Sequence, residues 1–149
     1  MPLFTAEFYA VRYQAQPSLV RGVVQRPLSP AEFTEACELL LATAQQHQCP
    51  FWLLDGRADT AERPRDVYEW LDDEFLPRVY KTLGLIPCLA VVARADFWDS
   101  LRSQYYASPT STFFSSTVRA AWFTNENEAL TWLGQFRPAI GVAAGGRDT

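Results

Sequence analysis

The residues best placed for chemistry follow a short apolar run in the first half of the chain. Residues 51–54 are consecutive apolar residues, and Asp55 ends the run just before Gly56. This pattern is typical of a buried central strand of an α/β sheet whose carboxyl end opens into a loop. Ligands bind at such carboxyl ends in open α/β sheets, so the segment 55–65 is the first candidate site. The simpler interpretation of Asp55 is a turn cap that accepts N–H bonds from the loop.

Three arginines follow in the same loop. Arg57, Arg63 and Arg65 alternate with acidic residues, Asp59 among them, and Thr60 lies between them as a residue that would accept a phosphate. Guanidinium groups near a helix amino terminus hold phosphate or carboxylate groups. A solvated loop of mutually paired charges is the alternative, and such mixtures usually form one.

The single histidine and the three cysteines do not form a catalytic or metal-binding set. His47 lies at the polar end of a predicted helix, and Cys49 follows it by two residues. A Cys–His nucleophile also needs a group that orients the histidine and an oxyanion hole, and the sequence supplies neither. One histidine and scattered cysteines give no coordination set. We therefore predict no enzyme activity, no metal and no cofactor.

The bulk composition is that of one globular domain. The chain has 149 residues, of which 48% are hydrophobic and 20% charged, and its formal net charge is −4. This charge argues against general nucleic-acid affinity, and no apolar run approaches the ~20 residues of a membrane helix. The amino terminus lacks the pattern of a signal peptide. We expect one domain over 1–138, a disordered tail over 139–149, and a cytoplasmic location without membrane insertion.

Apolar periodicity predicts an α/β fold. Its five strands are expected at residues 4–14, 19–26, 51–55, 87–93 and 118–123, the first two forming an opening hairpin. Because strands and helices alternate after the hairpin, we expect a mixed, mostly parallel five-stranded sheet. The two near-continuous apolar strands, 51–55 and 87–93, should be parallel neighbours in its interior.

About four helices are expected to cover this sheet. The first has the clearest start signal, with Ser29 as N-cap and Glu32 completing a capping box. The second runs over 64–83 and should kink or break near Leu76, because Pro77 lies inside it. A third begins at Asp96, and the last follows residues 124–125.

The aromatic content suggests a second candidate region. Aromatic residues make up 14% of the chain, and Trp98, Tyr106, Phe113 and Phe114 lie near one another in sequence. A protein interface or a ligand pocket would use such side chains. Filling of the core is the alternative, since the helix stripes account for many of the aromatic residues.

The chain resembles the STAS domains, which have the fold of anti-sigma-factor antagonists, among small bacterial proteins grouped with STAS and SEC14 domains. The resemblance is carried by the opening hairpin and by the segments 52–57, 68–71 and 126–133. It implies an α/β fold that ends on a strand and a helix. Anti-sigma-factor antagonists carry a phosphorylatable serine in the loop that corresponds to 55–60, and this loop contains none. The resemblance therefore does not imply the phosphorylation switch.

These features predict a non-enzymatic module that binds a protein partner or itself, as a two-fold homodimer. The alternative is a domain that binds a small molecule or lipid, as the SEC14 side of the resemblance implies, and an enzyme without a recognisable site is a minor third. A deep apolar pocket would favour a ligand, whereas a flat aromatic patch would favour a partner. The candidate binding residues are Asp55, Arg57, Asp59, Thr60, Arg63, Arg65, Trp98, Tyr106, Phe113 and Phe114.

Overall fold

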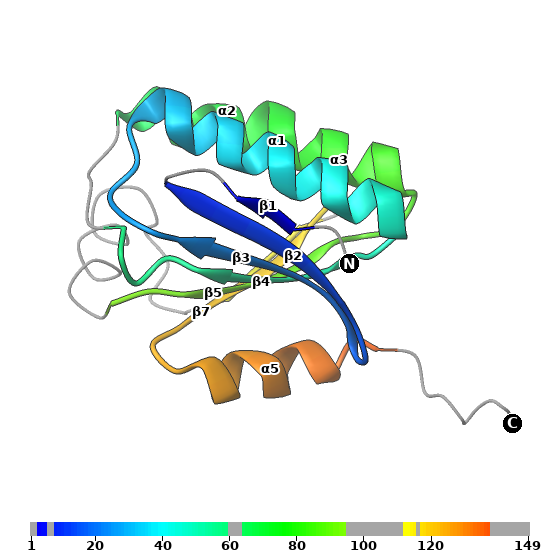
Figure 1. The fold of residues 1–149 in the computed structure, drawn as a ribbon. Helices are drawn as coiled ribbons and strands as arrows, with labels where there is room; N and C mark the ends of the chain where they lie inside the picture. Colours follow the sequence, from blue (N-terminus) through cyan, green and yellow to red (C-terminus); the bar gives the residue numbers. More distant parts are fainter. Residues whose placement is uncertain (1–2, 6–7, 60–63, 95–111, 116, 138–149) are drawn as a thin grey trace, which may run out of the picture.

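The computed structural model describes residues 3–5, 8–59, 64–94, 112–115 and 117–137. These residues form three layers, with one sheet between two layers of helix (Figure 1). Helices α1 (Pro30–His47), α2 (Arg65–Trp70) and α3 (Leu76–Leu83) lie on one face of the sheet, and α5 (Glu126–Gly134) covers the other. The fold is therefore α/β, as predicted.

The described strands form one mixed sheet in the order β1-β2-β3-β4-β5-β7-β6. Strands β1 to β3 are antiparallel, β3 to β5 and β7 are parallel, and β6 is antiparallel to β7. Their bounds are β1 Leu3–Thr5, β2 Tyr9–Ala15, β3 Ser18–Val24, β4 Phe51–Asp55, β5 Cys88–Val92, β6 Thr112–Phe114 and β7 Arg119–Phe123. The expected parallel pairing of the two apolar strands, β4 and β5, inside the sheet is confirmed.

Two short edge strands were not predicted. The five predicted strands correspond to β2, β3, β4, β5 and β7, and the three-residue strands β1 and β6 extend the sheet to seven. Strand β1 overlaps the start of the range expected to form one strand over 4–14, but it pairs antiparallel to β2 instead of continuing into it. A three-residue strand is too short to carry a readable alternation of apolar and polar residues.

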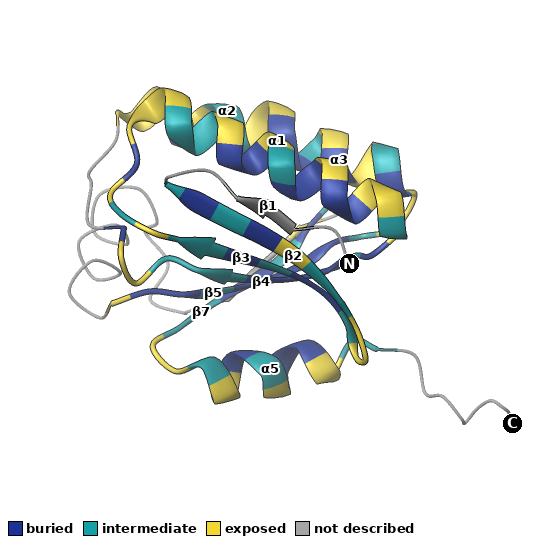
Figure 2. Cartoon of the chain, viewed as in Figure 1, coloured by how far each residue is buried: buried dark blue, intermediate teal, exposed yellow. Residues whose placement is uncertain are grey.

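Helix α1 begins as its sequence signal predicts. The Ser29 hydroxyl accepts from the Glu32 N–H, and the Glu32 carboxylate accepts from the Ser29 N–H, so the capping box is complete. Figure 2 shows that the buried residues of α1 lie on the side that faces the sheet. This burial fixes the face of α1 that contributes to the site described below.

The second predicted helix was expected to kink or break near Leu76. It is irregular there but stays helical through Pro77. Between α2 and α3 lies η1, a π-helical segment over Leu71–Phe75, in which the Leu76 N–H donates to the Leu71 carbonyl. Proline lacks an N–H and its ring crowds the preceding turn, and a π segment widens that turn. The helix expected from Asp96 lies outside the described residues. None of the described helices is long and apolar enough to cross a membrane.

Candidate functional site

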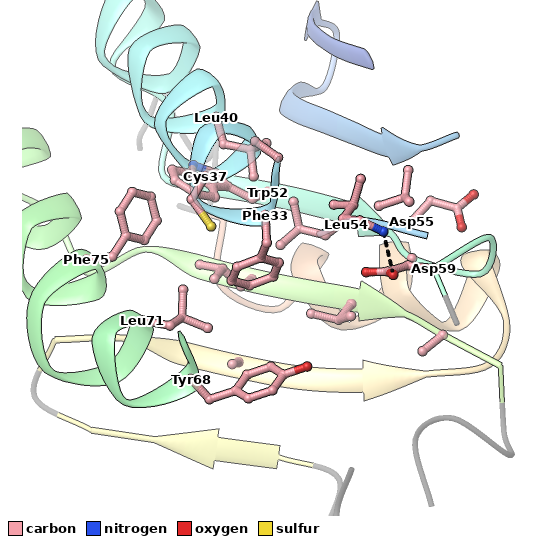
Figure 3. A pocket seen from close by; sticks show the side chains of 18 of the residues that line it. Phe33, Cys37, Leu40, Trp52, Leu54, Asp55, Asp59, Tyr68, Leu71 and Phe75 are labelled. Atoms are coloured by element: carbon pink, nitrogen blue, oxygen red, sulfur yellow. Dashed lines mark hydrogen bonds between the residues drawn. The ribbon is translucent and has the colours of Figure 1, made fainter. Parts of the chain in front are cut away.

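A cavity of about 170 Å³ lies between the sheet and the helical layer that contains α1, α2 and η1 (Figure 3). Phe33 and Cys37 line it from α1, and Leu71 and Phe75 line it from η1. Its wall is almost entirely apolar. The strand residues that line it are Tyr9, Val24, Trp52, Leu54, Leu89, Val91, Ala93, Ala120 and Trp122.

Strand alternation and residue size explain where the cavity forms. Side chains point alternately to the two faces of a sheet, so Ala120 faces the cavity while Ala121 faces α5. Among the strand residues that line the cavity, Ala93 and Ala120 contribute small side chains. Leu54 and Trp122 are only half-buried. The cavity is therefore deep between the layers and open to solvent at its edge.

The Tyr9 hydroxyl lies deep in the wall, above a glycine. A Cβ placed on Gly22 would lie 2.4 Å from the Tyr9 Oη and 3.0 Å from the Leu40 Cδ2. Only 4% of the Tyr9 side chain and backbone surface is exposed. Burial raises the pKa of Tyr9, and so do the nearby Cys37, Asp59 and Asp55. The hydroxyl is therefore neutral at physiological pH.

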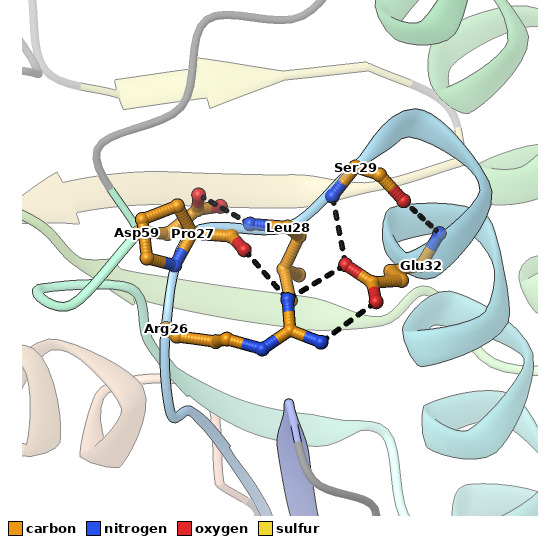
Figure 4. Close-up of polar contacts among 6 residues, drawn as sticks. All are labelled: Arg26, Pro27, Leu28, Ser29, Glu32 and Asp59. Atoms are coloured by element: carbon orange, nitrogen blue, oxygen red, sulfur yellow. Dashed lines mark hydrogen bonds and ion pairs between the residues drawn. The ribbon is translucent and has the colours of Figure 1, made fainter.

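Asp59 forms the polar end of the cavity. After β4 the chain turns back, with the Gly56 N–H bonded to the Val92 carbonyl at 2.7 Å and the Asp59 N–H to the Gly56 carbonyl at 3.0 Å. This turn places Asp59 below the start of α1, where its Oδ1 accepts from the Leu28 N–H at 3.3 Å (Figures 3 and 4). Only 6% of Asp59 is exposed.

A network of charges holds the start of α1 above Asp59 (Figure 4). The Arg26 guanidinium donates to both carboxylate oxygens of Glu32, at 2.9 and 2.8 Å, and also to the Pro27 carbonyl. These bonds from Arg26 and Ser29 lower the pKa of Glu32 to about 2. Because Glu32 also belongs to the capping box, the network fixes both the helix start and the adjacent Leu28.

Two of the three arginines predicted to bind an anion have carboxylate partners. Arg57 donates to both oxygens of Asp55, at 3.0 and 2.7 Å, and the Arg57 hydrogen bond lowers the pKa of Asp55. Arg65 is exposed and pairs with Glu69 at 3.4 Å, one helical turn away. Arg63 lies outside the described residues, so the anion site stays a prediction.

Only part of the predicted site is brought together by the fold. Asp55 and Asp59 both line the cavity. Thr60, Trp98 and Tyr106 lie outside the described residues, as Arg63 does. Phe113 and Phe114 form part of β6, and their backbone pairs with β7. Their side chains are not among the described parts of the structure.

The sequence analysis missed several cavity residues, of which Tyr9, Tyr68 and Asp72 carry polar groups. One signal for Tyr9 was present in the sequence. Gly22 interrupts a strand of β-branched residues, and a glycine inside a strand often marks the close approach of another group. Burial, followed by the charge of Asp73, raises the pKa of Asp72.

His47 and Cys49 both contact side chains of the hairpin formed by β2 and β3. The His47 ring stacks on Tyr13, with centroids 3.8 Å apart. Cys49 is fully buried, and its sulfur accepts from the Ser18 hydroxyl at 3.3 Å. Within the described ranges there is no group of three or more side chains that would hold a metal ion.

Comparison with known proteins gave no relative. No family model, no curated protein and no solved structure matches this chain. The resemblance to STAS domains therefore stays a prediction.

Proposed function

We propose that this protein binds a small apolar molecule in the cavity between α1, η1 and the sheet. The observation that carries the proposal is the size and wall of this cavity, about 170 Å³ lined by Phe33, Trp52, Leu71 and similar residues. An apolar molecule gains free energy when it leaves water for such a wall. The cavity lies toward the carboxyl ends of the parallel strands, where α/β sheets usually bind ligands.

The volume limits the part of a ligand that lies inside the cavity to about one ring with a short substituent. An engineered cavity of ~150 Å³ lined by similar side chains binds benzene, and drug-sized ligands occupy about 300–1,000 Å³. A phospholipid with two acyl chains is much larger than either. The volume therefore favours a small molecule over the membrane lipid that the SEC14 side of the resemblance implied.

Protein binding and self-association stay predictions with less support. Among the described residues, the exposed large hydrophobic side chains are Tyr80 and Leu85, so this part of the surface offers no broad apolar patch of the kind that marks an interface. Analytical ultracentrifugation at micromolar concentration tests the predicted dimer directly. A monomer near 16.9 kDa would contradict it.

Ethylbenzene is a suitable first probe because it has one ring, a short chain and no polar group. At roughly 0.6 kcal/mol per atom, its eight carbon atoms give a Kd on the order of 0.3 mM. At 1 mM it should stabilise the protein by about 0.9 kcal/mol and raise Tm by about 2–4 °C. The test is a titration followed by calorimetry and by the chemical shifts of the cavity methyl groups.

A variant in which a larger side chain fills the cavity serves as the control. Ala120→Leu places a larger side chain in the wall and should abolish both the Tm increase and the shifts of methyl groups such as those of Leu71 and Leu89. The proposal fails if ethylbenzene leaves the wild-type spectra unchanged up to its solubility limit. It also fails if Ala120→Leu binds ethylbenzene as well as the wild type does.

A further inference from the structure

We propose that α2 and η1 form a lid over the cavity, which opens at its junction with α3 to admit and release the ligand. This inference rests on the proposed function and adds how the ligand reaches the cavity. It depends on how the three helical segments are held, whereas the proposed function depends on the cavity's volume and apolar wall.

The first observation is that α3 is fixed to the neighbouring helix. Arg78 of α3 donates to both carboxylate oxygens of Glu38 on α1, at 2.9 and 2.6 Å. Val79 is fully buried and Leu83 is 6% exposed, so α3 also contributes apolar side chains to the core. These contacts hold α3 in the helical layer while the segment before it moves.

The second observation is that α2 and η1 lie above the cavity. Tyr68 is the buried residue of α2, and Phe75 is the buried residue of η1. Both line the cavity together with Leu71 (Figure 3). The ion pair between Arg65 and Glu69 joins two exposed positions of α2 itself, so it does not tie this helix to the layer. Segments with few buried apolar residues open locally at a low free-energy cost, and lids are drawn from such segments.

The third observation is an interrupted helical connection between the lid and α3. The Leu76 N–H donates to the Leu71 carbonyl, five residues earlier, as in a π-helix. The next residue, Pro77, has no N–H, so the Asp73 carbonyl receives no helical bond from it. Helices bend where the regular series of backbone hydrogen bonds is interrupted, and π segments are frequent at functional sites. The interruption lies between the segment above the cavity and the fixed α3, which is the place of a hinge.

Amide hydrogen exchange of the wild type, followed residue by residue by NMR, tests the lid. We expect the amides of 67–75 to exchange about tenfold or more faster than those of 79–83, with a weaker dependence on urea, because the lid opens without unfolding α3. Ethylbenzene at 1 mM should slow exchange of the lid amides about fourfold, since a Kd on the order of 0.3 mM leaves about a quarter of the protein free. Helix α5 covers the opposite face of the sheet, so amides that open locally there should keep their rates.

Pro77→Ala supplies the missing N–H at the hinge. One additional backbone hydrogen bond should slow exchange of the lid amides about fivefold. It should also slow both entry and exit of ethylbenzene about fivefold, measured by NMR line shapes. The Kd should change by less than about twofold, because the closed state already predominates. Pro30→Ala is the matched control. Pro30 is the first residue of α1, where a helix needs no N–H, so this variant should keep the wild-type rates.

The outcomes distinguish the lid from the proposed function. The inference is overturned if the lid amides of the wild type exchange no faster than those of α3, or if bound ethylbenzene does not slow them. Unchanged entry and exit rates in Pro77→Ala would also overturn it, and in each of these cases the apolar site stands. If ethylbenzene does not bind the wild type, the proposed function fails, and the lid fails with it because it has no ligand to admit.

Discussion

Enlarging two neighbouring alanines on β7 should have opposite effects on stability. Ala120 faces the cavity and Ala121 faces the α5 side, and both are buried, at 6% and 0% exposed. Replacing each in turn with leucine adds the same atoms to the same strand. Only the space that receives the side chain differs between the two variants, so local backbone effects largely cancel in the comparison.

The expected magnitudes follow from burial and from close packing. Leucine at position 120 buries about three additional methylene groups at ~0.8 kcal/mol each, less about 0.5–1 kcal/mol of lost rotamer freedom. Ala120→Leu should therefore increase the free energy of unfolding by about 1.5 kcal/mol. Ala121→Leu crowds the packed layer between β7 and α5, in which Ala129 and Leu133 are also buried, and overpacking costs about 1–3 kcal/mol. The two variants should differ by about 2.5–4.5 kcal/mol.

Urea denaturation measures this difference. The midpoint should rise for Ala120→Leu and fall for Ala121→Leu, at an unchanged denaturant slope, because the surface exposed on unfolding is nearly the same. Equal destabilisation of both variants would refute the reasoning, since it would mean that the space next to Ala120 is already filled.

Three further predictions concern residues around the cavity. Gly22→Ala should lower the free energy of unfolding, measured by urea denaturation, by about 1–3 kcal/mol. Adding Tyr9→Phe should recover part of this loss, because it removes the phenol oxygen that the new Cβ would contact. If the effects of the two substitutions simply add, that contact is contradicted. Ser29→Ala should cost about 1 kcal/mol of unfolding free energy through loss of the helix cap, and an unchanged urea midpoint would argue against the capping box. Arg57→Gln should raise the pKa of Asp55, measured by NMR titration. The lowered pKa of Asp55 in the folded wild type contributes stability that is present at neutral pH and is lost as the pH falls below about 4. The loss of unfolding free energy in acid should therefore be smaller in Arg57→Gln than in the wild type. An equal loss in both proteins would contradict the ion pair.

Local signals made the helices and the central strands readable from the sequence. The capping box at Ser29 needs only residues three positions apart, and the apolar runs of β4 and β5 reflect burial on both faces. Such patterns depend on neighbours along the chain. The short strands β1 and β6 are defined by their pairing partners, which the sequence analysis did not identify. The continuation of the helix through Pro77 likewise depends on the π segment that precedes it.

The cavity could not be predicted from the sequence because it depends on the spacing between the helical layer and the sheet. From the sequence, Ala120 is an ordinary strand residue, and only the packing of the helical layer on the sheet makes it part of the cavity wall. Asp59 was identified as part of a charged loop, but its burial beneath Leu28 results from a turn that returns the chain to the start of α1. The contact between Tyr9 and Gly22 joins two strands through a ring, and only the glycine hinted at it.

The most direct test of the central claim, that an apolar cavity is available to a ligand, is a crystal structure of the protein under xenon pressure. Xenon binds in apolar cavities of this size, and its anomalous signal locates it independently of the protein atoms. We predict a peak between Phe33, Trp52 and Leu71, and no such peak in Ala120→Leu crystals under the same pressure. Wild-type crystals in which side chains fill this space, with no xenon peak between α1, η1 and the sheet, would contradict the account.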